Sequence, residues 1–334
     1  MHHLRKPYLV FLGDVALRSD AKTGFGLRDW CRDDVIGEFS LAAAQVSLDL
    51  PRMTPAEAAA AGAGSVVIGV APAGGQLPPG WIPALEAALQ AGLDVVSGMH
   101  TRLERYPELV DAARATGAQL INVRHSDSVW PVGTGIRRSG RRLLTVGTDC
   151  ALGKKYTALA VTRALTARGI KATFRATGQT GILIAGQGIA IDAVVSDFVA
   201  GAAETLSPAN DAHHWDVVEG QGALFHPAYA GVTLGLLHGS QPDAIVLCHD
   251  PSRETIEDHP HIRLPALDDA IRRYIEAGRL TNPDIRCVGV AINSSTLSDA
   301  VWAHYQHRLR TELQLPVCDP MRGGVEPIVE ALIA

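Results

Sequence analysis

The chain has 334 residues, of which 47% are hydrophobic and 19% charged, and its formal net charge is −5. These values indicate a globular protein of two ordinary domains, and the lack of a basic field argues against nucleic acid as a partner. No run approaches 18 uninterrupted apolar residues, and the apolar stretch at 8–13 is too short for a signal-peptide core, so we expect a cytoplasmic protein that spans no membrane.

The first part of the chain alternates short apolar runs with helix-like ones. The expected strands lie at 8–13, 65–71, 93–98 and 118–123, and the expected helices at 81–92 and 106–117. This alternation predicts a mainly parallel sheet covered by helices on both faces. We therefore predict a Rossmann-like domain over 1–135, although no Gly-x-Gly-x-x-Gly is present. A Pro- and Gly-rich loop at 72–79 follows the second strand, at the kind of edge where such sheets bind ligands.

The remainder, 136–334, is predicted to be a second α/β domain, joined to the first by a connector at 127–142. Its expected strands lie at 143–146, 170–175, 215–218, 244–247 and 287–292, and its expected helices at 158–167, 267–278 and 299–314. The five cysteines are scattered without a Cys-x-x-Cys pair, which indicates reduced thiols. A small-molecule substrate and a homo-oligomer of unspecified size are expected.

A Gly-rich loop joins the first strand and helix of this second domain. The string TVGTDCALGKKYT occupies 145–157, and in this context it predicts a P-loop whose backbone N–H groups and helix end point at one anion. The predicted cofactor-binding residues of the loop are Gly147, Thr148, Asp149, Gly153, Lys154, Lys155 and Tyr156.

The loop departs from the common G-x-x-x-x-G-K-[ST] pattern in two ways. Five residues separate Gly147 from Gly153, and Lys155 stands where a Ser or Thr hydroxyl usually binds Mg²⁺. An ammonium cannot ligate a cation, so two adjacent lysines indicate a phosphate held without metal. No metal is predicted, although Thr148 or Thr157 could supply the missing hydroxyl.

Glu219 follows the strand at 215–218 and precedes Gly220 and Gly222. That position places the carboxylate at the edge of the sheet that faces the P-loop, where it can accept a proton or hold an ammonium. A carboxylate that caps the next turn is the structural alternative. His226 lies a few residues further on and is a second candidate for the general base, against a solvated loop histidine.

The string TGQTG at 177–181 follows the strand that ends at Arg175. Arg175 could clamp a substrate carboxylate, and the string could supply oxyanion donors. The predicted substrate and oxyanion residues are Gly178, Gln179, Thr180 and Gly181, with a plain tight turn as the alternative.

Asn293 ends the strand at 287–292 and could hydrogen-bond an adenine edge, or form an Asx-turn. Cys150 lies within the P-loop, where a helix N-terminus favours a thiolate. Packing of a small side chain is the better explanation for Cys150.

Three motifs together resemble the dethiobiotin-synthetase-like branch of P-loop proteins: GTDCALGK at 147–154, VVEGQG at 217–222 and GVAIN at 289–293. The longer strings at 13–30, 176–204 and 218–253 resemble, more specifically, a two-domain bacterial family of D-glutamate N-acetyltransferases. This resemblance implies a Rossmann-like first half, acetyl-CoA as the donor and a role in D-amino-acid catabolism. CoA can bind without Mg²⁺, which agrees with the paired lysines.

We therefore expect an acetyl-CoA-dependent N-acetyltransferase acting on an acidic amino acid, with D-glutamate as the implied substrate. Glu219 or His226 would take the proton of the amine, and Arg175 would hold a carboxylate. Two other functions stay open at this point. One is a kinase or ligase of the dethiobiotin-synthetase type that uses ATP with Mg²⁺, and the other is a nucleotide-sensing binding module.

Overall fold

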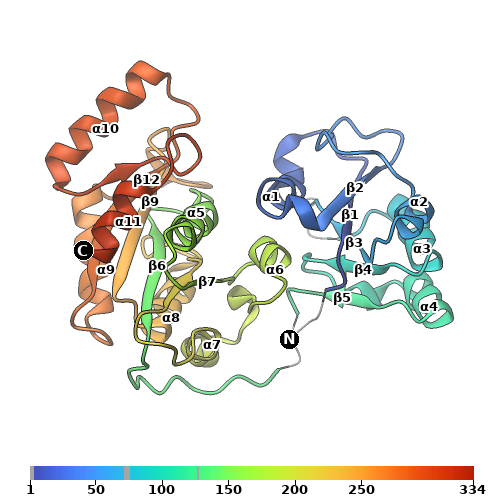
Figure 1. The fold of residues 1–334 in the computed structure, drawn as a ribbon, viewed down its shortest axis with the longest axis horizontal. Coiled ribbons are helices and arrows are strands. Elements are labelled where there is room, and N and C mark those ends of the chain that lie inside the picture. The colour runs from blue at the N-terminus through green and yellow to red at the C-terminus, as the bar shows by residue number, and fades with distance from the viewer. Residues whose placement is uncertain (1–3, 71–75, 126–127) are drawn as a thin grey trace. The chain divides into compact units, whose positions relative to one another are not determined.

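The computed structural model describes residues 4–70, 76–125 and 128–334 (Figure 1). Residues 72–75 of the loop expected at 72–79 lie outside these residues. The chain divides into two compact units, Met1–Ser128 with Gln179–Ala190 and Val129–Gly178 with Ile191–Ala334. Both are α/β units built on a parallel sheet, which confirms the predicted fold class. The predicted ranges 1–135 and 136–334 did not anticipate that 179–190 groups with the first unit.

The first unit has a five-stranded parallel sheet in the order β2-β1-β3-β4-β5. Its strands are β1 (Tyr8–Gly13), β2 (Val35–Ser40), β3 (Ser65–Ile68), β4 (Asp94–Ser97) and β5 (Leu120–Asn122). Its helices are α1 (Lys22–Trp30), α2 (Pro55–Ala60), α3 (Ile82–Gln90), α4 (Pro107–Thr116) and α6 (Gln179–Ala185). Every residue of β1, which lies between β2 and β3, is buried, as expected for a strand that is covered on both faces.

Helix α6 belongs to the first unit because its apolar residues and its first turn pack there. The hydroxyls of Thr23 in α1 and Thr180 in α6 lie 2.9 Å apart, and both side chains are buried. The hydroxyl of Tyr8 donates to the carbonyl of Leu183 at 3.5 Å. The chain therefore returns to the first unit at Gln179–Ala190, and α6 becomes part of the core of that unit.

The second unit has a six-stranded parallel sheet in the order β13-β12-β9-β6-β8-β7, and a separate antiparallel hairpin. The strands are β6 (Arg141–Gly147), β7 (Ala172–Arg175), β8 (Trp215–Val218), β9 (Ala244–His249), β12 (Arg286–Ile292) and β13 (Val317–Cys318), and the hairpin is β10 (Thr255–Ile256) with β11 (His259–Arg263). The helices are α5 (Lys154–Ala167), α7 (Val199–Leu206), α8 (Ala230–Ser240), α9 (Leu267–Gly278), α10 (Asp299–Leu313) and α11 (Glu326–Ile333).

The direction of each crossover decides which face of this sheet a helix covers. The chain leaves β6 toward β7 but then returns past β6 to β9 and β12, and parallel crossovers are almost always right-handed. Helix α5 therefore covers one face together with α11, and α7, α8 and α9 cover the other (Figure 1). The change of direction falls between β6 and β9, the kind of switch point where open α/β sheets bind ligands.

The predicted elements agree with the structure better in type than in extent. Strand β8 and helix α9 have the predicted bounds, whereas α5 begins at Lys154 rather than at 158. Helix α6 begins at Gln179, within the string 177–181 for which a plain tight turn was the alternative. No helix among the described residues is both long and apolar enough to cross a membrane.

Two glycines of α8, Gly231 and Gly239, allow a test of how closely α8 packs against α7. A Cβ added at Gly239 would lie 2.1 Å from the carbonyl oxygen of Ala200, whereas a Cβ at Gly231 would meet nothing within 4 Å. We expect Gly239→Ala to lower the free energy of unfolding by about 1–3 kcal/mol, because α7 and α8 must separate. Gly231→Ala should raise it by about 0.5–1 kcal/mol through helix propensity. Urea unfolding measures both, and equal effects would contradict this packing.

Candidate functional site

The loop between β6 and α5 presents a row of backbone donors. Ala151 and Gly153 have left-handed φ angles of 53° and 105°, which turn successive peptide groups toward the same side. Among the described residues, none accepts a hydrogen bond from the amides of Ala151, Leu152, Gly153 or Lys154. Such a concave row of amides at a helix N-terminus is suited to an anion.

Asp149 is fully buried and holds the loop in this shape. One carboxylate oxygen accepts the Cys150 amide at 2.7 Å, and the other accepts Arg253 Nη1 at 3.0 Å and the Glu257 amide at 2.8 Å. Arg253 Nη1 also donates to the Cys150 carbonyl at 3.0 Å. Both carboxylate oxygens of Asp149 are thus engaged within the protein.

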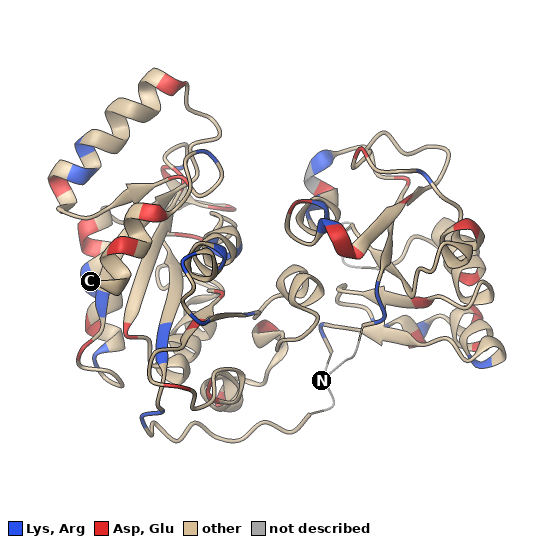
Figure 2. Ribbon diagram, in the orientation of Figure 1, with Lys and Arg blue, Asp and Glu red and all other residues tan. Residues whose placement is uncertain are grey.

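The two loop lysines are the first two residues of α5, and Figure 2 shows basic residues in blue on this helix. Lys154 is buried, its Nζ donates to the Asp149 carbonyl at 2.8 Å, and burial lowers its pKa. Lys155 is half-buried, with its Nζ 4.6 Å from the centre of the Tyr156 ring. A Cβ at Gly147 would lie 3.1 Å from Lys154 Nζ, so glycine there leaves room for the ammonium.

The hydroxyls that could have replaced the missing Mg²⁺ ligand have partners within the protein. Thr148 Oγ1 lies 2.9 Å from Nδ1 of His249. Thr157 Oγ1 donates to the Gly153 carbonyl at 3.1 Å and accepts the thiol of Cys248 at 3.4 Å. Both threonines are buried.

Glu219 lies directly after β8 and beside the P-loop lysines. Its side chain is 4% exposed, and one carboxylate oxygen accepts the amides of Thr177 and Gly178 at 3.0 and 3.2 Å. Burial raises the pKa of Glu219, against the opposing effects of the Lys155 charge and these two amide hydrogen bonds. The carboxyl group is therefore more basic than a solvated one and has a fixed orientation.

The other predicted substrate residues have structural partners. The Gly178 amide is engaged by Glu219, and the remaining three residues begin α6 in the first unit. Gln179 accepts from Arg124 at 3.0 Å, and Thr180 pairs with a threonine of α1. Arg175 donates from Nε to the buried carboxylate of Asp216 at 2.8 Å.

Asn293 forms the Asx-turn that was the alternative to adenine recognition. Its side-chain oxygen accepts the Ser295 amide at 3.3 Å, and its Nδ2 donates to Asp250 at 3.0 Å. Both ends of the side-chain amide are thus used, one within the loop that follows β12 and the other by a carboxylate directly after β9.

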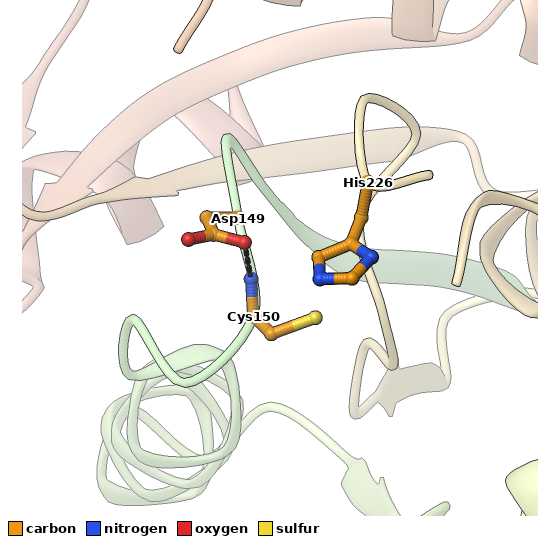
Figure 3. A group of neighbouring side chains, drawn as sticks. All are labelled: Asp149, Cys150 and His226. Atoms are coloured by element: carbon orange, nitrogen blue, oxygen red, sulfur yellow. Dashed lines mark hydrogen bonds between the residues drawn. The ribbon is translucent and has the colours of Figure 1, made fainter. Parts of the chain in front are cut away.

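His226 lies against the P-loop, closer than its position in the sequence indicated. It is 4% exposed, and its ring stacks on Tyr229 with centroids 4.4 Å apart. Figure 3 shows one ring nitrogen of His226 turned toward Asp149 and Cys150, and a ligand atom from each of the three lies within 4.8 Å of the others. Burial raises the pKa of the Cys150 thiol, which keeps it neutral.

These three side chains are metal-ligand types, yet the charges around them oppose a cation. The carboxylate of Asp149 already pairs with the guanidinium of Arg253, and the ammonium of Lys154 lies 2.8 Å from the Asp149 carbonyl. Positive charge at this loop is supplied by the protein itself, which favours an anionic ligand.

Two residues that hold the loop were absent from the sequence-based site. Arg253 follows β9 just beyond the end of the strand, and strand ends of a parallel sheet were the signal that could have found it. Tyr274 of α9 is fully buried and donates to the Gly147 carbonyl at 2.8 Å while accepting the Leu224 amide at 2.9 Å. Nothing in the helical pattern of 267–278 marks Tyr274 as a P-loop neighbour.

Comparison with known proteins gives the family. Residues 131–329 match the P-loop domain and residues 38–126 the Rossmann-like domain of DUF1611, both described as domains of unknown function. A crystal structure of a DUF1611 family protein from Anabaena variabilis ATCC 29413 superimposes with a TM-score of 0.87 at 31% identity, over 98% of this chain and 99% of that one.

Two curated relatives carry a functional name. The proteins from Tritonibacter scottomollicae and a Pseudoalteromonas species are 45% and 43% identical over 331 and 329 residues, and both are named D-glutamate N-acetyltransferase. The matches cover 99% and 98% of this chain and 99% of each relative. The chain belongs to this two-domain DUF1611 family, which confirms the resemblance seen in the sequence.

The buried His249 behind the loop predicts a pH dependence of stability. Burial lowers the pKa of His249 to about 4, against the opposing charge of Asp250. Between pH 6.5 and 4 the unfolded chain binds a proton that the folded chain does not, so the free energy of unfolding falls as the pH drops through this range.

From pH 7 to pH 5 we expect the wild type to lose about 2 kcal/mol more stability than His249→Asn in urea unfolding. Asn keeps a polar partner for Thr148 but does not titrate. The exposed His213, replaced in the same way, serves as the control. Parallel curves for wild type and His249→Asn would contradict the burial argument.

Proposed function

We infer that the chain is a D-glutamate N-acetyltransferase, the activity named for its two full-length relatives. We propose that the acetyl donor is acetyl-CoA and that the P-loop at 147–154 binds phosphate groups of the CoA moiety. The observation that carries the proposal is the loop itself. It combines amides that have no acceptor among the described residues and a buried lysine with Lys155 at the usual hydroxyl position, and both nearby threonine hydroxyls have partners within the protein.

Acetyl transfer needs a neutral amine, because an ammonium has no lone pair for the thioester carbonyl. In the proposal, Glu219 accepts the proton of the amine as the N–C bond forms, and the C–S bond then breaks to release CoA as a thiolate. Burial makes Glu219 a better base than a solvated carboxylate, and the amides of Thr177 and Gly178 fix its direction. Arg175 has no part in this proposal, because its guanidinium pairs with Asp216.

The length of CoA sets a condition on this assignment. The pantetheine arm is about as long as four extended residues, so a straight arm would place the thioester roughly 14 Å from the pyrophosphate. Glu219 lies beside the P-loop, since a Cβ at Gly220 would lie 3.1 Å from Lys154 Cδ. Glu219 therefore reaches the amine only if the arm folds back over the ends of β7 and β8.

The proposal also covers the compartment, the oligomeric state and the metabolic role of the enzyme. We propose a cytoplasmic homo-oligomer that acts in D-amino-acid catabolism. All five cysteines are free thiols, which supports a reducing compartment.

Metal-independent cofactor binding is the first test. Acetyl-CoA at about 100 times its Kd should stabilise the wild type by roughly 2.7 kcal/mol in the presence of EDTA. Lys154→Met keeps the apolar stem and removes the charge, so calorimetry should show CoA affinity reduced by about 10-fold or more. The exposed Lys171→Ala is the matched control. If ATP stabilises the protein only with Mg²⁺ and CoA does not stabilise it, the proposal is wrong.

Turnover by Glu219→Gln is the second test, because this change keeps the shape and removes the base. We expect kcat for D-glutamate at saturating acetyl-CoA to fall by roughly 10²-fold or more while CoA binding persists. The raised pKa of Glu219 places an acid limb in the wild-type profile of kcat/KM above the ordinary carboxylate range, and the variant should lose it.

The exposed Glu312→Gln is the control for that substitution, with L-glutamate and D-aspartate as comparison substrates. Reduced CoA affinity with unchanged kcat would mean that Glu219 faces the phosphates and that the arm lies extended. Acetylation of none of the three amino acids by the wild type would overturn the enzyme assignment itself.

A further inference from the structure

Three histidines lie in a row that leads from the P-loop to the protein surface. The ring centroids of His226 and His259 are 5.0 Å apart, and those of His259 and His261 are 5.9 Å apart. His226 is buried, His259 is half-buried and His261 is exposed. Both outer histidines come from strand β11, next to the hairpin residues that hold the loop.

Backbone hydrogen bonds fix which nitrogen of His226 carries the proton. Nδ1 of His226 lies 3.1 Å from the amide of Ala228, and an amide N–H can only donate, so Nδ1 must offer a lone pair. The proton of the neutral imidazole is therefore on Nε2. His259 has the opposite tautomer, because its Nδ1 lies 2.8 Å from the Glu257 carbonyl, which can only accept.

This tautomer conflicts with a role for His226 as a base. A general base needs a free lone pair directed at the substrate, and the only lone pair of neutral His226 is held by Ala228. The nitrogen left to face the P-loop is Nε2, as a donor (Figure 3). The hydrogen bond that His226 makes within 4–70, 76–125 and 128–334 is at Nδ1, and Nε2 is not among the fully buried atoms, so it can reach a partner from outside the protein.

The groups around Nε2 of His226 indicate which kind of hydrogen-bond acceptor would suit it. The amides of the loop from Ala151 to Lys154 are donors without acceptors among the described residues, and they belong to the same loop as Asp149 and Cys150. The Cys150 thiol stays neutral, and the carboxylate of Asp149 is engaged by Arg253 and two backbone amides. Several donors around one loop are suited to an anionic acceptor from outside the protein.

We propose that His226 is a phosphate-binding residue of the P-loop, donating from Nε2 of a neutral imidazole to a phosphate oxygen, and that it is not the general base. The proposal rests on the proposed function only for the identity of the ligand, a CoA-type phosphate. Tyr229, stacked on the ring, keeps the imidazole in the orientation that directs Nε2 at the loop.

The test uses two substitutions that separate donation from basicity. His226→Gln places an amide N–H near the position of Nε2 and cannot act as a base, whereas His226→Ala removes both properties. By calorimetry, His226→Ala should weaken CoA binding by about 10-fold or more, and His226→Gln should restore affinity to within about 3-fold of wild type. The exposed His304→Ala is the matched control.

ADP and inorganic pyrophosphate serve as additional probes, and acetylation of D-glutamate reports separately on the proposed function. Unchanged CoA affinity in His226→Ala would overturn the inference. So would a kcat that falls equally in both variants, with loss of an ionisation from the pH profile, because that pattern identifies a base. Binding of none of the three probes by the wild type would also overturn it, whether or not D-glutamate is acetylated by another part of the protein.

Discussion

The ion pair between Arg253 and Asp149 is the interaction on which the candidate site depends. Asp149 is fully buried, and a buried carboxylate without partners would cost several kcal/mol. Arg253 and two backbone amides satisfy both of its oxygens. The amides that follow, from Ala151 to Lys154, have no acceptor among residues 4–70, 76–125 and 128–334. The same guanidinium ties the segment after β9 to the segment after β6, which are the two sides of the switch point in the sheet.

The charges at this point explain why a metal is not required for the proposed chemistry. In many P-loops one lysine and a Mg²⁺ ion, held by a Ser or Thr hydroxyl, neutralise the phosphate charge. Here Lys154 and Lys155 are adjacent, Arg253 lies behind the loop, and Thr148 and Thr157 are engaged elsewhere. The neutral donor of His226 adds an interaction without adding charge. Glu219 is an acid placed beside the lysines, and burial suits it to a proton-transfer role.

Much of this fold followed from the sequence, because its strong signals are local. Apolar runs of four to seven residues give the central strands of both sheets, and the Gly-rich string gives the loop that precedes α5. Strand β2, the two-residue strand β13 and the return of α6 to the first unit depend on contacts distant in sequence, which no local pattern carries. Glu219 could be placed because strand ends of a parallel sheet meet at one edge.

The individual partners of the site residues could not be read in the same way. Arg175 and Asn293 are polar residues near strand ends, as binding residues often are, yet each pairs with a nearby carboxylate. The role of Tyr274 depends on a helix that returns to the loop from more than a hundred positions away. The tautomer of His226 depends on a single backbone amide two residues away, a detail of turn geometry that the string GALFHPA does not specify.

The central claim is that the loop binds a phosphate group of CoA through protein donors alone. A crystal structure of the protein grown with CoA and EDTA tests it most directly. The account predicts a phosphate group within hydrogen-bond distance of the amides of 151–154 and of Nε2 of His226, with no metal ion beside it. A CoA whose phosphates lie away from this loop, or a loop that is filled only by a nucleotide with Mg²⁺ when EDTA is left out, would contradict the account.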